Sequence, residues 1–275
     1  MTLPPEGRRA ARPGALRRWV AAHTDDRAVR LARAAVYRAT AVLHTEDHDP
    51  ATNGELRVLR CVAPEARVLI DVGAHHGSWA STAAEICPRA VVHCFEVASP
   101  TRAILRARVG RHPRIRVPDL GLLDAPGTVR VKYYSDDDRL SSLVDYPHEV
   151  AAEWLEERVE TGERYLAQAG IDRVDLLKVD TEGADLRVLH GFRSALVDGR
   201  VRAVQFEYGF ASVLSGALLE RFHALLEPCG YIVGRVLPQR VEFRPYRLSD
   251  ERFFGPNFLA VRHQDDDLLS LLASA

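Results

Sequence analysis

Apolar runs alternate along the chain with segments of helical periodicity. Continuous apolar runs rich in β-branched residues predict buried strands at residues 68–72, 91–95, 174–179 and 201–206. Apolar positions three and four residues apart predict helices at residues 55–62, 78–86, 101–109, 184–189 and 218–226. This alternation is typical of an α/β domain whose parallel sheet is covered by helices on both faces. Residues 231–237 and 257–261 are expected to complete the sheet as a hairpin, and the alternation over residues 128–134 predicts an antiparallel strand.

The first 45 residues have a different pattern from the rest of the chain. They carry nine arginines against three acidic residues, and prolines near the start predict a flexible tail. Apolar residues between Val29 and Leu43, spaced three and four apart, form a narrow stripe on one face of a predicted helix. We expect this stripe to pack on the main domain or on a second subunit, which makes a homodimer through these helices one expected arrangement. Asp25 and Asp26 interrupt the basic face, which argues against a membrane partner.

The predicted organisation has three parts. Residues 1–54 form a flexible tail and helical extension, residues 55–262 form the α/β domain, and residues 263–275 form a C-terminal tail. The 275 residues carry 37 basic and 38 acidic side chains, a net charge of −1 that argues against a nucleic-acid partner. Since no apolar run is long enough for a membrane span or a signal peptide, we expect a soluble, cytoplasmic protein.

A glycine-containing turn follows the first predicted strand of the domain. Asp71, Gly73 and Gly77 form the pattern D-x-G-x-x-x-G at the point where this strand leads into a helix. Ligands of open parallel sheets bind at such turns, and glycine lets the backbone approach them closely. The spacing differs from the G-x-G-x-x-G of pyrophosphate binders and suits S-adenosylmethionine, which has no phosphates. The pair His75-His76 suggests a metal, but adjacent histidines on a loop do not easily share one ion.

Acidic residues follow two further strands. Glu96 ends the second strand about 25 residues after Asp71, where a carboxylate can accept hydrogen bonds from both ribose hydroxyls of an adenosine cofactor. Lys178 lies inside an apolar strand and therefore needs a carboxylate partner or a route to solvent. Asp180 and Glu182 follow it, and such carboxylates can hold a metal, position a hydroxyl or act as a base, or can cap a helix and pair with the lysine.

These segments resemble the FkbM family of S-adenosylmethionine-dependent methyltransferases over about residues 53–262. Residues 177–185, Leu-Lys-Val-Asp-Thr-Glu-Gly-Ala-Asp, closely match the hallmark segment of that family. The turn at residues 71–74, Phe95-Glu96, Ser141-Ser142-Leu143 and the segments at 205–207 and 257–260 resemble other family elements in the same order. His75 stands where the family usually has Asn, and Val97-Ala98 replace Pro-Asn, which we expect to alter cofactor contacts rather than abolish binding.

The resemblance implies a class I methyltransferase fold, a Rossmann-like sheet of seven strands with the last antiparallel. It implies S-adenosylmethionine as cofactor and a hydroxyl of a sugar or secondary metabolite as acceptor, and it leaves a divalent metal open. The expected cofactor-binding residues are Asp71, Gly73, Ala74, His75, Gly77, Glu96, Val97, Asp119, Leu120, Ser142 and Asp180. The expected catalytic residues are Asp180, Glu182 and Glu207, and the expected acceptor-binding residues are Tyr146, His148 and Tyr208.

Three alternatives remain from the sequence. An N- or carboxyl-directed methyltransferase is the nearest one, because no residue identifies the accepting atom. A non-catalytic cofactor-binding partner that has kept the fold is the second, although the presence of Asp71, Glu96, Asp180 and Glu182 together argues against it. A nicotinamide dehydrogenase is the third, and the missing G-x-G-x-x-G disfavours it.

Overall fold

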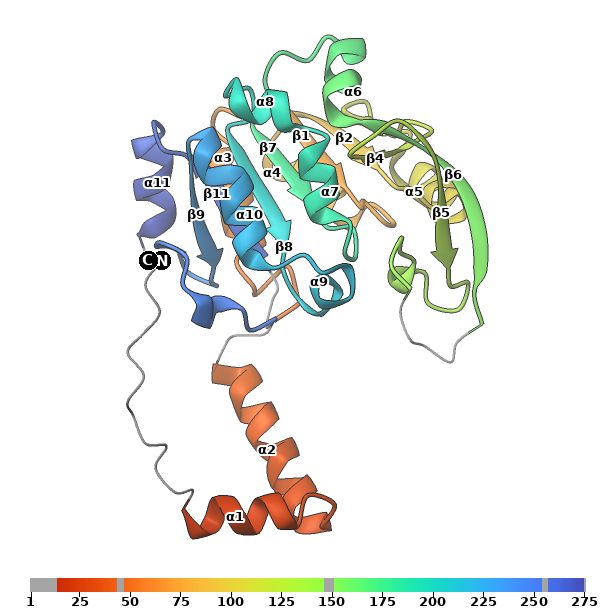
Figure 1. Cartoon of the computed structure of the whole chain (residues 1–275). Helices are drawn as coiled ribbons and strands as arrows, with labels where there is room; N and C mark the ends of the chain where they lie inside the picture. The colour runs from red at the N-terminus through yellow and green to blue at the C-terminus, as the bar shows by residue number, and fades with distance from the viewer. Residues whose placement is uncertain (1–13, 44–46, 146–150, 254–256, 275) are drawn as a thin grey trace. The chain divides into compact units, whose positions relative to one another are not determined.

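The computed structural model describes residues 14–43, 47–145, 151–253 and 257–274 and divides into two compact units, Met1–Glu46 and Asp47–Ala275 (Figure 1). The first unit contains α1 (Ala15–Ala22) and α2 (Arg27–Leu43). Asp26 accepts a hydrogen bond from the backbone of Ala28, so it caps α2 instead of lying on the face of a helix. No helix in the described ranges is long and apolar enough to cross a membrane.

The second unit is built on an eight-stranded sheet with the order β3-β2-β1-β7-β8-β11-β9-β10 (Figure 1). Its strands are β1 (Val68–Val72), β2 (Val91–Phe95), β3 (Ile115–Arg116), β7 (Leu176–Val179), β8 (Ala203–Glu207), β9 (Tyr231–Val236), β10 (Val241–Phe243) and β11 (Asn257–Arg262). The first five of these pair in parallel, and β11 lies antiparallel between β8 and β9. The sheet is therefore the Rossmann-like sheet that the family resemblance implies.

Helices cover both faces of this sheet because successive strand residues point to opposite sides. On β1, Leu69 packs into one apolar core, whereas Ile70 and Val72 pack into the other. The core around Leu69 contains side chains of α3 (Glu55–Val62), α4 (Ser78–Ile86), α5 (Ser99–Val109) and α11 (Asp266–Ala273). The opposite core contains side chains of α6 (Gly162–Ala169), α7 (Asp185–His190), α8 (Arg193–Val197) and α10 (Leu219–Leu226). Other short helices are α9 (Phe210–Ser215), η2 (Glu227–Cys229) and η3 (Leu248–Asp250).

A second, three-stranded sheet lies between β3 and β7 in the sequence. It has the order β4-β6-β5 and consists of β4 (Gly121–Leu123), β5 (Gly127–Tyr133) and β6 (Glu153–Thr161). The antiparallel pairing of β5 with β6 confirms the strand predicted at residues 128–134. Between them lies the short helix η1 (Asp138–Leu140). This insertion brings residues 138–143 to the carboxyl edge of the main sheet, where Asp138, Arg139 and residues 141–143 line its cavity.

Four details differ from the sequence expectations. The main sheet has eight strands instead of seven, because β10 pairs with the edge strand β9. β9 forms its hairpin with β10, and β11 inserts between β9 and β8 rather than forming that hairpin itself. The segment expected as a C-terminal tail contains α11, which is held in place because Leu268 and Leu272 are buried. Asp47–Gly54 belongs to the second unit, since the Asn53 side chain is buried there.

Candidate functional site

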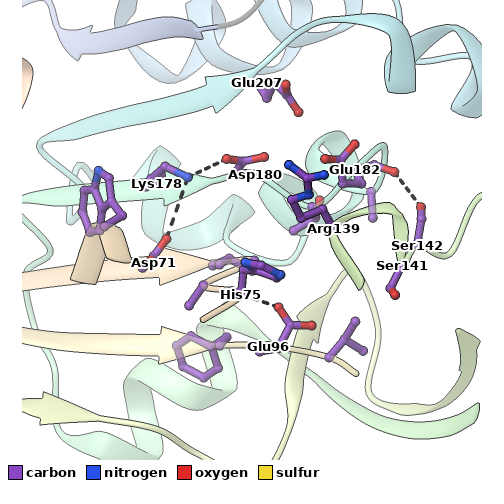
Figure 2. Close-up of a pocket in the computed structure, with 18 of the residues that line it drawn as sticks. Asp71, His75, Glu96, Arg139, Ser141, Ser142, Lys178, Asp180, Glu182 and Glu207 are labelled. Carbon is purple, nitrogen blue, oxygen red and sulfur yellow. Dashed lines mark hydrogen bonds and ion pairs between the residues drawn. The ribbon is translucent and has the colours of Figure 1, made fainter. Parts of the chain in front are cut away.

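A cavity of about 440 Å³ lies at the carboxyl ends of the central strands (Figure 2). Strand β1 is paired on one side with β2 and on the other with β7. In an open α/β sheet, ligands bind at the carboxyl ends of strands where the strand order reverses, and this cavity occupies that position. The predicted site residues that line it are Asp71, Gly73, Ala74, His75, Glu96, Val97, Ser142, Asp180, Glu182 and Glu207.

Several other predicted cofactor residues do not line the cavity. Gly77 has a positive φ of 83°, and a Cβ there would meet α5 side chains at 2.8–2.9 Å, so this glycine serves helix packing. The Asp119 side chain is 76% exposed and pairs with Arg106 at 2.8 Å. Leu120 packs against the core, and the following residues, Gly121 and Leu122, line the cavity instead.

Of the predicted acceptor residues the structure describes Tyr208, which does not line the cavity. Tyr208 is buried, and its hydroxyl donates a hydrogen bond to Glu251, away from the cavity. Glu251 also accepts hydrogen bonds from the first backbone amides of α10, so this contact anchors that helix. Tyr146 and His148 lie outside the described residues.

The turn after β1 is held against the ends of two neighbouring strands. The backbone amides of Gly73 and Ala74 both donate to the carbonyl of Phe95 at the end of β2, at 2.8 and 3.0 Å. Gly73 has a φ of 86°, and a Cβ at this position would lie 1.7 Å from the carbonyl oxygen of Asp180. Only glycine fits between these strands, so the close approach seen at Gly73 is to the backbone of Asp180, whereas the sequence predicts a close approach to a ligand.

Lys178 is buried between two carboxylates. The strand register places it beside Asp71 of β1, and its Nζ lies 4.0 Å from Asp71 and 2.7 Å from Asp180 (Figure 2). This confirms that Lys178 has a carboxylate partner. Burial raises the pKa of Asp71 to about 6. Burial acts to lower the pKa of Lys178, but the two carboxylates outweigh it and raise that pKa.

Three carboxyl groups gather at one end of the cavity. Asp180, Glu182 and Glu207 each have a carboxyl oxygen within 4.8 Å of the others. Burial and the charges of Asp180 and Glu182 hold the pKa of Glu207 well above its ordinary value. Burial also acts to raise the pKa of Asp180, but Lys178 outweighs it and the pKa is lowered. These opposite shifts make Asp180 the carboxyl group of this pair that ionises first.

Glu96 binds the backbone of the turn after β1 and the backbone that follows β2. Its carboxylate is almost fully buried and accepts hydrogen bonds from the backbone amides of His75 and Ala98, each at 3.0 Å. Burial raises the pKa of Glu96 to about 7 against the opposing effect of these bonds. A carboxylate has about four lone-pair positions, so Glu96 keeps accepting capacity for a ligand.

The residues that sequence reasoning missed come mainly from the insertion. Residues 138–143, which we call the strap, contribute Asp138, Arg139 and Ser141 to the cavity lining, and Figure 2 shows Arg139 extending toward Glu182. Ser142 of the strap donates a hydrogen bond to the backbone carbonyl of Glu182 at 2.6 Å. Ser141 and Ser142 belong to the Ser-Ser-Leu segment that resembles a family element, whereas no local pattern marks Asp138 and Arg139, because only tertiary contacts bring these two residues to the sheet edge. The lining also includes Asn53, Glu55 and Asn257, a buried hydrogen-bonded group that was not among the predicted site residues.

Three characterised proteins are similar to parts of the chain. The 2-O-methyltransferase NoeI of Sinorhizobium fredii is 27% identical over 190 residues, 64% of this chain and 76% of NoeI. The 31-O-demethyl-FK506 methyltransferase FkbM of Streptomyces tacrolimicus is 30% identical over 157 residues, 46% of this chain and 60% of FkbM. The AMB antimetabolite synthetase AmbE of Pseudomonas aeruginosa is 28% identical over 181 residues, 53% of this chain but only 8% of AmbE.

The family model for the methyltransferase FkbM domain matches residues 71–233. This range begins at the buried aspartate of β1 and ends within β9, so it includes the turn after β1, Glu96, the strap and the acidic cluster. The match extends over more than half of the chain and agrees with the strand order of the sheet. The chain belongs to the FkbM methyltransferase domain family.

Proposed function

We propose that this protein is an S-adenosylmethionine-dependent O-methyltransferase acting on a hydroxyl group of a sugar or secondary metabolite. The observation that carries the proposal is the cluster of Asp180, Glu182 and Glu207 in a cavity that Glu96 and the Gly73 turn also line. The names of NoeI and FkbM, both O-methyltransferases, support the same reaction. We further propose that residues 55–262 carry the activity.

The residues of the cavity fit S-adenosylmethionine. Its volume of about 440 Å³ is in the usual range for small-molecule sites. We assign the ribose to the remaining accepting capacity of Glu96, and the negatively charged lining suits the cationic sulfonium. When bound, this cofactor supplies an activated methyl group for in-line transfer. Holding the acceptor oxygen in line contributes about 7 kcal/mol or more to lowering the barrier.

The acidic cluster can take the proton that the acceptor hydroxyl loses. Asp180 is held ionised by Lys178, and the raised pKa of Glu207 makes its ionised form a stronger base than an ordinary carboxylate. Because the two carboxyl groups interact, we assign the proton to the Asp180–Glu207 pair rather than to one residue. Glu182 completes the cluster, and Ser142 fixes its backbone, so we assign Glu182 to orienting the acceptor.

The charge of this cluster discriminates among acceptors. A carboxylate acceptor would enter beside three acidic side chains and be repelled, which disfavours carboxyl-directed transfer. A neutral hydroxyl meets no such repulsion and finds hydrogen-bond acceptors. An amine would be attracted as an ammonium ion but must lose its proton before it attacks, so amine acceptors are the second arm of the test.

Calorimetric titration with S-adenosylmethionine and S-adenosylhomocysteine, with EDTA or Mg²⁺, tests the cofactor assignment first. Saturable binding is expected, and its absence from well-folded protein would reject the proposal. A screen of hydroxylated, amine and carboxylate acceptors, read by S-adenosylhomocysteine release, then tests the acceptor class. Asp180→Asn and Glu207→Gln should lower turnover by roughly 100-fold at unchanged cofactor affinity. Glu160→Gln is the matched control, because Glu160 is buried outside the cavity lining.

We also propose that the first unit joins two copies of the chain. Its helices expose the apolar side chains of Leu16, Trp19, Leu31 and Val36, and Val29 is buried. Two such faces from two copies can cover each other in the self-complementary manner of a two-fold interface. The proposal concerns the α1–α2 unit alone.

A further inference from the structure

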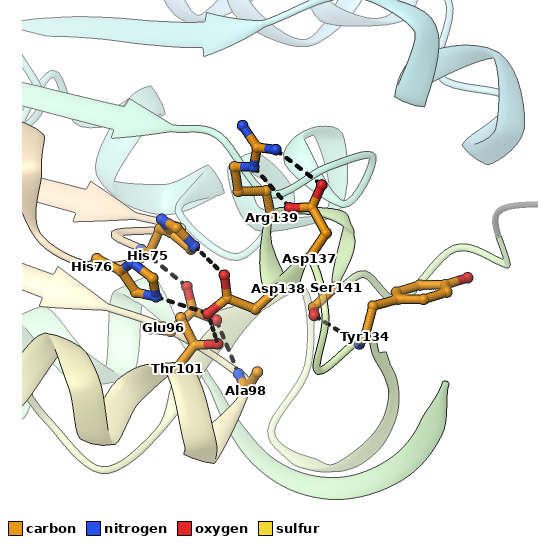
Figure 3. Close-up of polar contacts among 10 residues, drawn as sticks. All are labelled: His75, His76, Glu96, Ala98, Thr101, Tyr134, Asp137, Asp138, Arg139 and Ser141. Atoms are coloured by element: carbon orange, nitrogen blue, oxygen red, sulfur yellow. Dashed lines mark hydrogen bonds and ion pairs between the residues drawn. The ribbon is translucent and has the colours of Figure 1, made fainter. Parts of the chain in front are cut away.

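His75 and His76 place both of their ring Nε2 atoms on one carboxylate, that of Asp138 (Figure 3). His75 has a left-handed backbone with φ 46°, which is uncommon for a residue other than glycine. Neighbouring side chains that would otherwise diverge are stacked, with ring centroids 3.7 Å apart and planes at 20°. Their Nε2 atoms lie 2.8 Å from Oδ1 and Oδ2 of Asp138 respectively. The structure thus removes the objection that adjacent histidines diverge too far to share an ion.

We propose that His75, His76 and Asp138 bind a divalent transition-metal ion of the Zn²⁺ type. Two imidazole nitrogens and one carboxylate form a ligand set found in metalloprotein sites with open coordination positions. Ligand atoms at about 2.1 Å from a tetrahedral zinc ion lie about 3.4 Å from each other. The ligand atoms of His75, His76 and Asp138 all lie within 4.8 Å of one another, and each Nε2 is 2.8 Å from a carboxylate oxygen, so small shifts bring them to that spacing. The ion would replace the two histidine–aspartate hydrogen bonds, with each imidazole carrying its proton on Nδ1.

The surroundings of the three side chains suit a metal site that solvent can reach. Their exposed fractions are 34% for His75, 22% for His76 and 14% for Asp138, so an ion and a water ligand can enter. Thr101 donates a hydrogen bond to Oδ2 of Asp138 at 3.0 Å, and such outer contacts orient ligating carboxylates. Imidazole ligands favour zinc, nickel or cobalt, whereas Mg²⁺ and Ca²⁺ prefer all-oxygen sites.

A metal at this position would fix one end of the strap across the cavity. Asp138 begins η1 in the strap, and both histidines lie on the turn after β1. The other end is already held by the Ser142 contact with Glu182. The ion would therefore hold Arg139 over the cavity and slow the escape of a ligand beneath it. This consequence rests on the proposed function, because the ligand it concerns is S-adenosylmethionine, whereas the metal site itself does not.

Zinc titration of the full chain tests the site directly. The protein is purified without a histidine tag, stripped with a chelator and titrated with Zn²⁺ in a calorimeter. One tight site is expected, and Asp138→Asn and His76→Ala should each weaken it by roughly 100-fold. Asp137→Asn is the matched control, since Asp137 neighbours Asp138 but pairs with Arg139. Glu207→Gln should leave the affinity unchanged, because it alters the separate acidic cluster.

Each result decides the assignment. The site is supported if Asp138→Asn and His76→Ala lose zinc affinity with unchanged melting curves, while both control variants keep their zinc affinity. Three outcomes overturn it. They are no saturable zinc binding, an Asp138→Asn variant with the zinc affinity of the wild type, or a loss of zinc affinity confined to Glu207→Gln. Replacement of zinc by Co²⁺ gives a visible spectrum that should disappear in His76→Ala. Zinc should also tighten S-adenosylmethionine binding in the wild type, and an unchanged affinity would reject the strap consequence alone. Failure of S-adenosylmethionine to bind at all would count against the proposed function and leave the zinc titration readable.

Discussion

The carbonyl oxygen of Asp180 occupies the space where Gly73 would carry a side chain, 1.7 Å from the position of a Cβ. The turn after β1 and the acidic end of β7 are therefore in direct contact. Gly73→Ala must push these two strand ends apart and also strain a residue with φ 86°. Overpacking costs about 1–3 kcal/mol and left-handed backbone about 1 kcal/mol more. We expect a loss of this size in the free energy of unfolding by denaturant titration, together with weaker cofactor binding.

Gly170→Ala separates the two contributions to that loss. Gly170 also has a positive φ, 64°, but a Cβ there would meet no atom within 4 Å. It should therefore lose only the backbone part and keep normal cofactor binding. If both alanine variants behave alike, the close approach of Gly73 to Asp180 has no energetic importance.

Lys178 compensates a buried negative charge, so its removal should be costly. Lys178→Met leaves Asp71 and Asp180 near one another without their cation. Breaking a buried ion pair in this way destabilises proteins by about 3–5 kcal/mol. We expect this loss in denaturant titrations near pH 7, and a smaller loss at acidic pH where Asp71 can be protonated. Lys132→Met is the matched control, because that lysine pairs with the exposed Asp145. An equal effect of the two variants would contradict the role of Lys178.

The central strands could be predicted from sequence because buried strands consist mainly of apolar residues. Residues 68–72 and 91–95 are apolar on both faces except for Asp71 and His93, and the structure has β1 and β2 at those positions. Strand β6 was not predicted, because it is rich in glutamate and its pairing with β5 decides its conformation. The edge strand β10 has only three residues, too few for a sequence pattern to indicate a strand. Its pairing with β9 decides its conformation.

The candidate site likewise contains residues that the sequence predicts and residues that it does not. Asp71, Glu96 and Asp180 each follow or end a recognisable strand, so their gathering at one edge follows from a parallel sheet. Asp138 reaches His75 across 63 positions of sequence through an insertion whose path no local pattern encodes. Tyr208 illustrates the opposite error: it follows Glu207 directly, but Tyr208 lies buried against Glu251, because its hydroxyl finds a partner there.

The raised pKa of Glu96 predicts a pH dependence of stability. The pKa of its carboxyl is about 7 in the folded protein and 4.5 ordinarily, so between these values the folded state binds more protons than the unfolded state. Stability from this group is therefore greatest at low pH and falls as pH rises toward 7, by at most about 3 kcal/mol. Glu96→Gln should remove this slope, measured as the difference between the two proteins in denaturant titrations from pH 4.5 to 7.5.

The same titration should affect the cofactor. An ionised Glu96 accepts hydrogen bonds more strongly, so S-adenosylmethionine affinity is expected to rise as pH passes through about 7. In Glu96→Gln the affinity should be lower and nearly independent of pH over this range. Calorimetry at pH 6 and pH 8 provides the comparison. Wild-type affinity that is the same at both pH values, and unchanged by the substitution, would remove Glu96 from the ribose.

The helices of the first unit predict a change of subunit number on truncation. Deletion of residues 1–45 removes α1 and α2, whose exposed Trp19, Leu31 and Val36 we assign to the contact between two copies. Light scattering should show a dimer for the full chain and a monomer for the truncated one. Val36→Asp should also give a monomer, because it places a charge in the apolar contact at a cost larger than such an interface tolerates. Arg30→Gln is the control, since Arg30 lies on the side of the same helix away from the stripe. The proposal is contradicted if the full chain is already monomeric or if the dimer persists after truncation.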